Sequence, residues 1–288
     1  MGEKKGVGFM REILAQTITD VVEKLCIEAN CHLPEDMKAC IQSARASEPW
    51  PQGQEILDRI IETFQVADRE NMPVCQDTGM ACVFVKLGQE VHIQGDLNEA
   101  IHEGVRRGYR EGYLRKSVVR DPLDRVNTGD NTPAVITYDI VPGDKVEITL
   151  APKGFGSENM SAIKMLRPSD GVEGVKEFVV QTVEAAGPNP CPPVVVGVGI
   201  GGTFDKAASL AKRALLRDTD SCHPDPFYAE LEKELLEKIN ALGIGPQGFG
   251  GKTTALAVNI ETFPTHIAGL PVAVNINCHV TRHQTEVI

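Results

Sequence analysis

The sequence lacks the features that mark several large classes of protein. No stretch approaches the roughly 20 apolar residues that a helix needs to cross a bilayer, so no membrane association is expected. The first residues, MGEKKGVGFMREILAQ, hold neither a continuous apolar run nor a small-residue cleavage site, which argues against a signal peptide. The eight cysteines are too sparse for a disulfide scaffold, and none stands in a CxxC pair. We therefore expect a cytoplasmic protein without the clustered cysteines of a zinc ribbon or a ferredoxin.

Positive charge is also scarce. The chain carries 29 Lys and Arg residues against 40 Asp and Glu residues, which gives a net charge of −11. A surface of this sign repels phosphate backbones, so nucleic acid is not an expected partner. A small anionic substrate would need a local cluster of cationic groups to bind against the global field.

Apolar periodicity predicts a mixture of helices and strands. Helical patterns cover residues 9–28, 54–67, 97–114, 171–186, 205–216 and 225–242. Strand-like runs cover residues 81–88, 134–141, 145–151, 194–199, 254–260 and 271–279, and a hairpin turn at 142–144 is expected between the second and third. This mixture predicts an α+β (mixed α/β) fold with mixed β-sheets flanked by helices. Because no linker or repeat is visible, residues 1–288 are interpreted as one catalytic domain.

Two glycine-rich segments resemble nucleotide-binding loops. Gly197, Gly199 and Gly202 form a G-x-G-x-x-G pattern after a strand, but no second strand ending in an acidic residue follows. Close packing between strand and helix is therefore the favoured interpretation. GPQGFGGKTT resembles a Walker A loop, yet Pro246 stands where its first glycine should be, so Lys252 is not expected to bind phosphate.

Three cysteines stand at turns or strand ends, where loops expose reactive groups. They are Cys75 in NMPVCQDTG, Cys191 in NPCPP and Cys278 in NINCH. Separations of 116 and 87 residues match no recognised ligand spacing, so spacing alone favours three unrelated buried thiols. Among the other cysteines, three are expected to be small buried residues and two to lie in polar loops: Cys26, Cys40 and Cys82, then Cys31 and Cys222.

The surrounding motifs change that interpretation. NMPVCQDTG, NTGDNTPAV, KGFGSENMS, NPCPPVVVGVGIGGT, GIGPQGFGGKTTA and NINCHVTRH resemble, in this order, the class I fumarase family of iron–sulfur hydro-lyases. The resemblance runs from about residue 10 to the C-terminus. The related tartrate dehydratase α subunit shares the CQDTG and CPP motifs, whereas KGFGSEN and GFGGKTTA look like the fumarase branch. The resemblance implies the fold of the class I fumarase N-terminal domain and the reversible dehydration of (S)-malate to fumarate, a tricarboxylic acid cycle reaction.

The resemblance also implies an oxygen-sensitive metal centre. Cys75, Cys191 and Cys278 would be the three thiolate ligands of a 4Fe–4S cluster. Three ligands leave one iron open to act as a Lewis acid on the substrate hydroxyl, whereas electron-transfer clusters normally have four cysteines. Asp77 would transfer the carbon-bound proton, and the alternative for Asp77 is an Asx-type turn before Gly79.

The resemblance places Gln76, Arg115, Gly154 and His266 as substrate contacts. Arg115 would grip one carboxylate of a small dicarboxylate in bidentate fashion, and His266 would donate to the other. The Gly154–Gly156 turn would offer backbone N–H groups. A surface arginine and a loop histidine are the plain alternatives for two of these residues.

The resemblance also implies partners. In single-chain family members a second domain follows, so a separate β subunit is expected to complete the active site of a homodimer of α or an α2β2 assembly. Three alternatives remain open at this stage: a tartrate-dehydratase-type α subunit for another 2-hydroxy dicarboxylate, a non-catalytic iron–sulfur scaffold subunit, and a nucleotide-binding module.

Overall fold

A computed structural model describes residues 10–288, which form two compact units. Unit 1 contains residues 10–32, 71–153 and 282–288, and unit 2 contains residues 33–70 and 154–281. Each unit is built from separate stretches of chain, which explains why no linker is visible in the sequence. Residues 1–9, on which the expectation of no signal peptide partly rests, lie outside the described residues. Within the described part, no helix combines the length and the apolar character that crossing a membrane requires.

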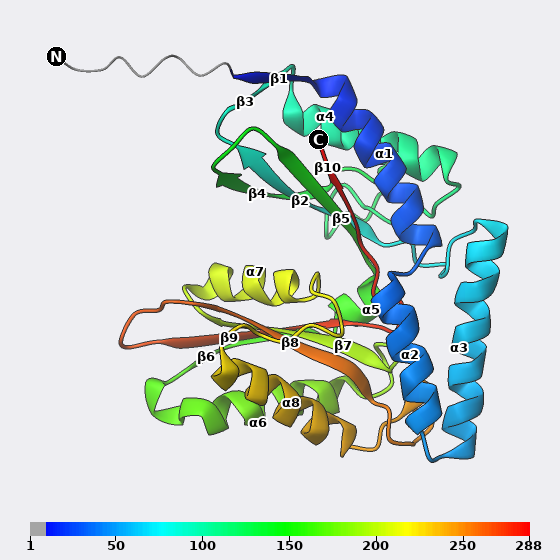
Figure 1. The fold of residues 1–288 in the computed structure, drawn as a ribbon, viewed down its shortest axis with the longest axis vertical. Coiled ribbons are helices and arrows are strands. Elements are labelled where there is room, and N and C mark those ends of the chain that lie inside the picture. Colours follow the sequence, from blue (N-terminus) through cyan, green and yellow to red (C-terminus); the bar gives the residue numbers. More distant parts are fainter. Residues whose placement is uncertain (1–9) are drawn as a thin grey trace. The chain divides into compact units, whose positions relative to one another are not determined.

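Unit 1 is a four-stranded sheet in the order β10-β5-β2-β4, with helices α1 and α4 packed against it and a small parallel β1–β3 pair beside them (Figure 1). Apolar residues of both helices and of the central strands form its core. The elements are β1 (Arg11–Leu14), α1 (Ala15–Cys31), β2 (Met80–Gly88), β3 (Val91–Gln94), α4 (Leu97–Glu111), β4 (Val135–Val141), β5 (Val146–Lys153) and β10 (Gln284–Val287).

The predicted hairpin between β4 and β5 is wrong. β2 lies between these two strands, parallel to β4 and antiparallel to β5. The reason is burial: residues 81–85 of β2 are all buried, whereas β4 alternates between half-buried and exposed positions. The most apolar strand of this sheet lies inside it, between β5 and β4, and β4 is an edge strand.

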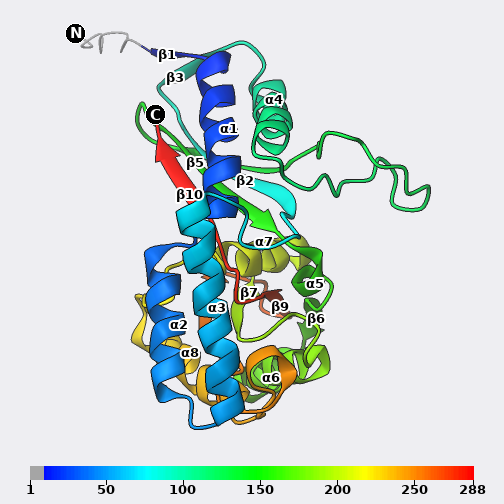
Figure 2. The ribbon, with the colours of Figure 1, turned by 90° about the vertical axis from the view of Figure 1, so that its right-hand side faces the viewer.

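Unit 2 is a second four-stranded sheet, in the order β6-β9-β7-β8. Helix α7 covers one face and α6 with α8 covers the other (Figure 1), while α2 and α3 lie side by side (Figure 2). The elements are α2 (Glu35–Ser47), α3 (Pro51–Glu70), α5 (Phe155–Glu158), β6 (Ala162–Leu166), α6 (Gly171–Ala186), β7 (Val194–Gly201), α7 (Phe204–Ala214), α8 (Pro226–Asn240), β8 (Ala255–Phe263) and β9 (Leu270–Asn277).

The architecture confirms the predicted α+β class with mixed sheets flanked by helices. Asp225 caps α8 as expected, because its side chain accepts a hydrogen bond from the Phe227 N–H. The first predicted helix is corrected, since residues 11–14 form β1 and the helix runs from Ala15 to Cys31. Helix α2 was not predicted, because only Met37 and Ile41 of its residues are buried and its apolar stripe is correspondingly thin.

The G-x-G-x-x-G glycines belong to the interface between β7 and α7. A Cβ atom on Gly197 would lie 2.2 Å from the carbonyl oxygen of Ala211, and one on Gly199 would lie 2.1 Å from that of Ala207. Only glycine permits this approach of helix to strand. Close packing, the favoured interpretation of these glycines, is confirmed.

The Walker-like loop binds an anion that the chain itself supplies. The carboxylate of Glu48, which is 1% exposed, accepts hydrogen bonds from the backbone N–H groups of Lys252 and Thr253 at 2.9 and 2.7 Å. The Thr253 hydroxyl and the Trp50 N–H also donate to it, at 2.7 and 3.2 Å. Burial by itself raises the pKa of Glu48, but these hydrogen bonds outweigh burial and hold the pKa below its usual value. The donors that a phosphate would need are therefore already used.

We expect Glu48→Gln to lower the free energy of unfolding at pH 7 by about 1–3 kcal/mol, because buried N–H donors lose a charged acceptor. A carboxylate with a lowered folded pKa stabilises above its unfolded pKa of about 4.3, and this contribution disappears as the pH falls through the lower folded value. The difference between wild type and variant in urea unfolding should therefore shrink below pH 4. Glu230→Gln, at a position with 74% side-chain exposure, is the matched control and should change little.

Candidate functional site

Two loops and two strand ends of unit 1 meet at one edge of its sheet, the edge formed by the ends of the strands. The Cys75–Gly79 segment leads into β2, and residues 127–134 lead into the parallel strand β4. The antiparallel strand β5 ends at this edge, where Lys153 pairs with Met80. β10, antiparallel to β5, begins at the same edge just after Arg282. Motifs that lie far apart in the sequence therefore gather at this edge.

The Cys75–Gly79 segment is a tight turn built around Asp77. The Asp77 N–H lies 3.4 Å from Cys75 Sγ, and Asp77 Oδ1 accepts a hydrogen bond from the Gly79 N–H at 3.0 Å. This second bond confirms the Asx-type turn, and it leaves open whether Asp77 also transfers protons. Gly79 has φ +73°, and a Cβ atom there would lie 2.8 Å from the Lys153 backbone, so glycine is required. Cys75 is half-buried, and Gln76 beside it is exposed.

Buried polar groups fix this turn and connect it to Arg115. The Tyr109 hydroxyl donates to the carbonyl oxygens of Thr78 and Gly79 at 2.7 and 3.1 Å, and burial raises the pKa of this phenol, so it stays a donor. The Thr78 hydroxyl donates to the carbonyl oxygen of Arg115 at 3.0 Å. The structure thus brings the Arg115 backbone to the turn that carries Cys75, with the Arg115 side chain exposed.

Asn131, in the NTGDNTP motif, completes this connection. It is fully buried, and its Oδ1 accepts from the N–H groups of Ser117 and Val118 at 2.7 and 3.2 Å. Its Nδ2 donates to the Gly79 carbonyl oxygen at 3.2 Å. One amide side chain therefore joins the segment that follows Arg115 to the turn that follows Cys75.

Unit 2 has a similar edge. Cys191 precedes β7, residues 245–254 precede the parallel strand β8, and Cys278 follows the antiparallel strand β9. Residues 154–159 precede β6, which is antiparallel to β9. Two of the predicted ligands, 87 residues apart in the sequence, thus lie at the same edge of one sheet.

His279 and Gln247 link the loops of Cys191 and Cys278. His279 Nδ1 lies 2.9 Å from the Cys191 carbonyl oxygen, in the geometry of an N–H donor to that oxygen. Gln247 donates to the Pro192 carbonyl oxygen from its backbone N–H at 2.7 Å and from Nε2 at 2.8 Å. Cys191 has φ +55°, a conformation that L residues rarely adopt and that these contacts hold in place.

Gly154 lies at the same edge as Cys191, and His266 does not. Gly154 is the N-cap residue of α5, and a Cβ atom on Gly156 would lie 3.9 Å from the carbonyl oxygen of Asn189 in the NPCPP loop. His266 is exposed in the connection between β8 and β9, at the opposite edge of the sheet (Figure 1). The eight residues of β9 separate it from Cys278, a distance of roughly 25 Å at about 3.4 Å per residue.

Comparison with known proteins identifies the family. Residues 19–287 match the model of the family described as fumarate hydratase (fumerase). The chain belongs to this family. It is 48% identical over 272 residues to a Methanocaldococcus jannaschii protein named putative L(+)-tartrate dehydratase subunit alpha, covering 92% of this chain and 95% of that relative. It is 36% identical over 272 residues to the L(+)-tartrate dehydratase subunit alpha of Escherichia coli strain UTI89, covering 93% and 89%.

Membership of the fumarase family makes the chain part of a hydro-lyase, and the observed α+β fold agrees with its class I N-terminal domain. Four residues that hold these loops by hydrogen bonds were not predicted from the sequence: Asn131, Gln247, His279 and Arg282. All four lie inside the motifs that resemble the fumarase family. Their roles are hydrogen bonds to backbone groups, which no sequence pattern reveals.

Three of the other five cysteines are more buried than the three predicted ligands. Cys26, Cys31 and Cys82 are buried, and burial raises the pKa of the Cys26 and Cys31 thiols. Cys31 is the last residue of α1, which corrects its predicted place in a polar loop. Cys40 is half-buried, which corrects its predicted place among the buried cysteines. Cys222 is exposed in the loop before α8, as predicted.

The donor chemistry at the predicted ligands fits an iron–sulfur cluster. Among residues 10–288, no three His, Cys, Asp or Glu side chains are already gathered as a metal site. However, the thiols of Cys75 and Cys278 both accept a backbone N–H from two residues further on, Asp77 and Val280, each at 3.4 Å. Hydrogen bonds to sulfur of this kind tune cluster thiolates. Cys191 is exposed, so its thiol is accessible to an external group.

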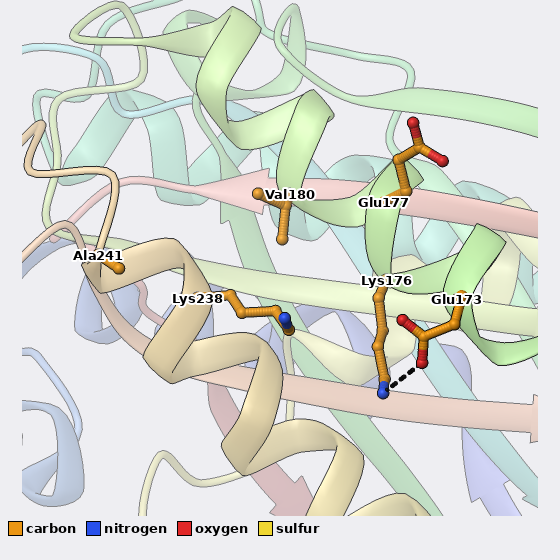
Figure 3. Close-up of a pocket in the computed structure, with 6 residues that line it drawn as sticks. All are labelled: Glu173, Lys176, Glu177, Val180, Lys238 and Ala241. Carbon is orange, nitrogen blue, oxygen red and sulfur yellow. Dashed lines mark hydrogen bonds and ion pairs between the residues drawn. The ribbon is translucent and has the colours of Figure 1, made fainter.

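A shallow groove between α6 and α8 offers no competing site (Figure 3). The ammonium group of Lys176 in this groove pairs with the carboxylates of Glu173 and Glu234, each at 2.8 Å. The ammonium group of Lys238 lies 3.7 Å from Glu234. A dicarboxylate would have to displace these ion pairs. None of the predicted site residues lines the groove, whose lining residues are Glu173, Lys176, Glu177, Val180, Lys238 and Ala241.

Proposed function

We propose that this chain is the α subunit of an iron–sulfur hydro-lyase that dehydrates a short 2-hydroxy dicarboxylate, with Cys75, Cys191 and Cys278 holding a 4Fe–4S cluster. The observation that carries this proposal is the link between the Cys191 and Cys278 loops through His279. Cys191 and Cys278 thus lie at one sheet edge as free cysteines, not joined in a disulfide. The N–H groups directed at Cys75 and Cys278 support the same role.

In this proposal, different residues around the cluster ligands carry out proton transfer and substrate binding. When bound, the cluster supplies an iron without a protein ligand, a Lewis acid for the substrate hydroxyl. Asp77, two residues from Cys75 in a rigid turn, takes the carbon-bound proton. Gln76 and Arg115, both exposed beside this turn, bind a carboxylate. Gly154, at the N-terminal end of the turn before β6, offers backbone N–H groups to the substrate.

The substrate is proposed as L(+)-tartrate or (S)-malate. The names of the relatives favour tartrate, and the KGFGSEN and GFGGKTTA motifs favour malate. Both substrates present two carboxylates and a 2-hydroxyl group, so the tasks assigned above apply to either. They differ in the second hydroxyl of tartrate, which needs a hydrogen-bonding partner of its own.

Two partners complete the proposal. The relatives are named alpha subunits, which supports a separate β subunit. We propose that it brings further cationic groups, because Arg115 is the one arginine predicted at the substrate and the chain carries a net charge of −11. His266, at the opposite sheet edge from Cys278, would reach this substrate from a second copy of the chain, as in the predicted homodimer or α2β2 assembly.

The test is dehydration of both substrates by the anaerobically reconstituted chain, with and without a candidate β subunit. We expect an iron–sulfur absorbance, about four irons per chain, slow turnover alone and much faster turnover with β. The ratio of kcat/KM for tartrate and malate then assigns the substrate. A pair that binds iron but dehydrates neither substrate would support the scaffold alternative, and full activity of the isolated chain would contradict a shared active site.

A further inference from the structure

Arg282 is a buried cation at the Cys75–Gly79 turn. Arg282 is 4% exposed, and its Nη2 donates a hydrogen bond to the carbonyl oxygen of Asp77. Its Nε and Nη1 have no hydrogen-bond partner among residues 10–288, and no carboxylate of these residues forms an ion pair with it. A buried guanidinium normally has a charged partner, because desolvation of an uncompensated ion is costly.

Arg217 in unit 2 shows the usual arrangement. Its guanidinium is also largely buried, and it pairs with the carboxylate of Glu232 at 2.6 Å. Arg282 has no such group. The Asp77 carboxylate is directed at the Gly79 N–H, and only the Asp77 main chain accepts from Arg282.

Two other titratable groups that feel the Arg282 charge, Cys31 and Tyr109, do not supply a negative charge. The Arg282 charge acts on the Cys31 thiol and the Tyr109 phenol, but burial dominates and raises the pKa of both, so both are neutral at pH 7. Among residues 10–288, therefore, no anionic side chain pairs with the Arg282 guanidinium. Arg282 touches the turn that carries Cys75, and it follows Cys278 by four residues in the sequence.

We propose that Arg282 is a positioning residue whose buried charge compensates the negative charge of the thiolate-bound cluster. It fixes the turn through the Asp77 carbonyl oxygen, and its unused N–H groups remain for anionic sulfur. This inference rests on the proposed function, because it requires a cluster at Cys75. Outer-shell donors and net charge set both the affinity and the reduction potential of such centres.

The experiment compares Arg282→Met with Arg217→Met in the full chain. Without iron, Arg282→Met should melt no lower than wild type, because it removes an uncompensated buried charge. Arg217→Met should melt lower, because it leaves the buried Glu232 carboxylate without its cation. After anaerobic loading, Arg282→Met should release iron to a chelator about 10- to 100-fold faster than wild type. Its cluster should also have a more negative reduction potential. Arg282→Lys should recover part of both properties, and Arg217→Met should release iron at the wild-type rate.

Three outcomes would overturn this assignment. If Arg282→Met retained iron and potential like wild type, the inference would fail and the proposed function would stand. If its iron-free form melted as low as Arg217→Met, Arg282 would be an ordinary structural residue. If the wild-type chain with its β subunit took up no iron, the proposed function would fall, and the inference with it.

Discussion

Cys75→Ser should lose its iron and its hydro-lyase activity after anaerobic reconstitution, and Cys191→Ser and Cys278→Ser should do the same. A serine hydroxyl is a poor ligand for cluster iron, and a cubane held by two thiolates exposes two irons. The loss of activity should be larger than the loss of about 10- to 100-fold that follows when a residue hydrogen-bonded to a metal ligand is removed. The measurements are iron and sulfide per chain, the absorbance of the cluster, and the rate of dehydration.

The controls are cysteines that differ from these three in one property at a time. Cys222 is exposed, like Cys191, but lies in the loop before α8, so Cys222→Ser tests whether exposure alone is enough. Cys26 is fully buried between α1 and α4, so Cys26→Ser tests for general damage to unit 1. Iron loss from either control equal to that from Cys75→Ser would show that the ligand set is chosen wrongly.

Sequence patterns predicted the local elements far better than their pairing. The helices at 171–186 and 225–242 follow from apolar periodicity and end residues, which act locally. The prediction of a β4–β5 hairpin was wrong although its turn residues fit. The more apolar strand β2 pairs with both β4 and β5 and so separates them. Strand pairing depends on which strand gains most from the sheet centre, and a local pattern does not contain that comparison.

In the candidate site, too, local motifs were predictable from the sequence and long-range contacts were not. The loops of Cys75, Cys191 and Cys278 were visible as motifs, and the structure adds what fixes them. Gln247 and His279 bind main-chain oxygens of the NPCPP loop from segments more than 50 residues away. Each such contact needs only one donor side chain at the right position. It therefore produces no periodic pattern or characteristic residue spacing that could be detected in the sequence. The opposite case is His266, whose motif is clear but whose position at the other sheet edge only the fold reveals.

Asp77→Asn should retain the cluster and the fold but lose activity by about 10²- to 10⁴-fold, the usual contribution of a general base. The asparagine side-chain oxygen can still accept from the Gly79 N–H, so the turn that holds Cys75 should survive. An amide cannot take up the carbon-bound proton at neutral pH. The measurements are kcat with the β subunit present, iron content, and thermal melting of the iron-free chain.

Asp77→Ala separates the two roles of this side chain. It removes the acceptor for Gly79 as well as the base, so it should release iron faster than Asp77→Asn and melt at a lower temperature. Loss of activity in both variants, greater in Asp77→Ala, with iron retained only in Asp77→Asn, is the expected pattern. If Asp77→Asn kept more than about a tenth of the wild-type kcat, far above the residual rate left when a general base is lost, Asp77 would be a turn residue alone. The base would then have to come from another residue or from the β subunit.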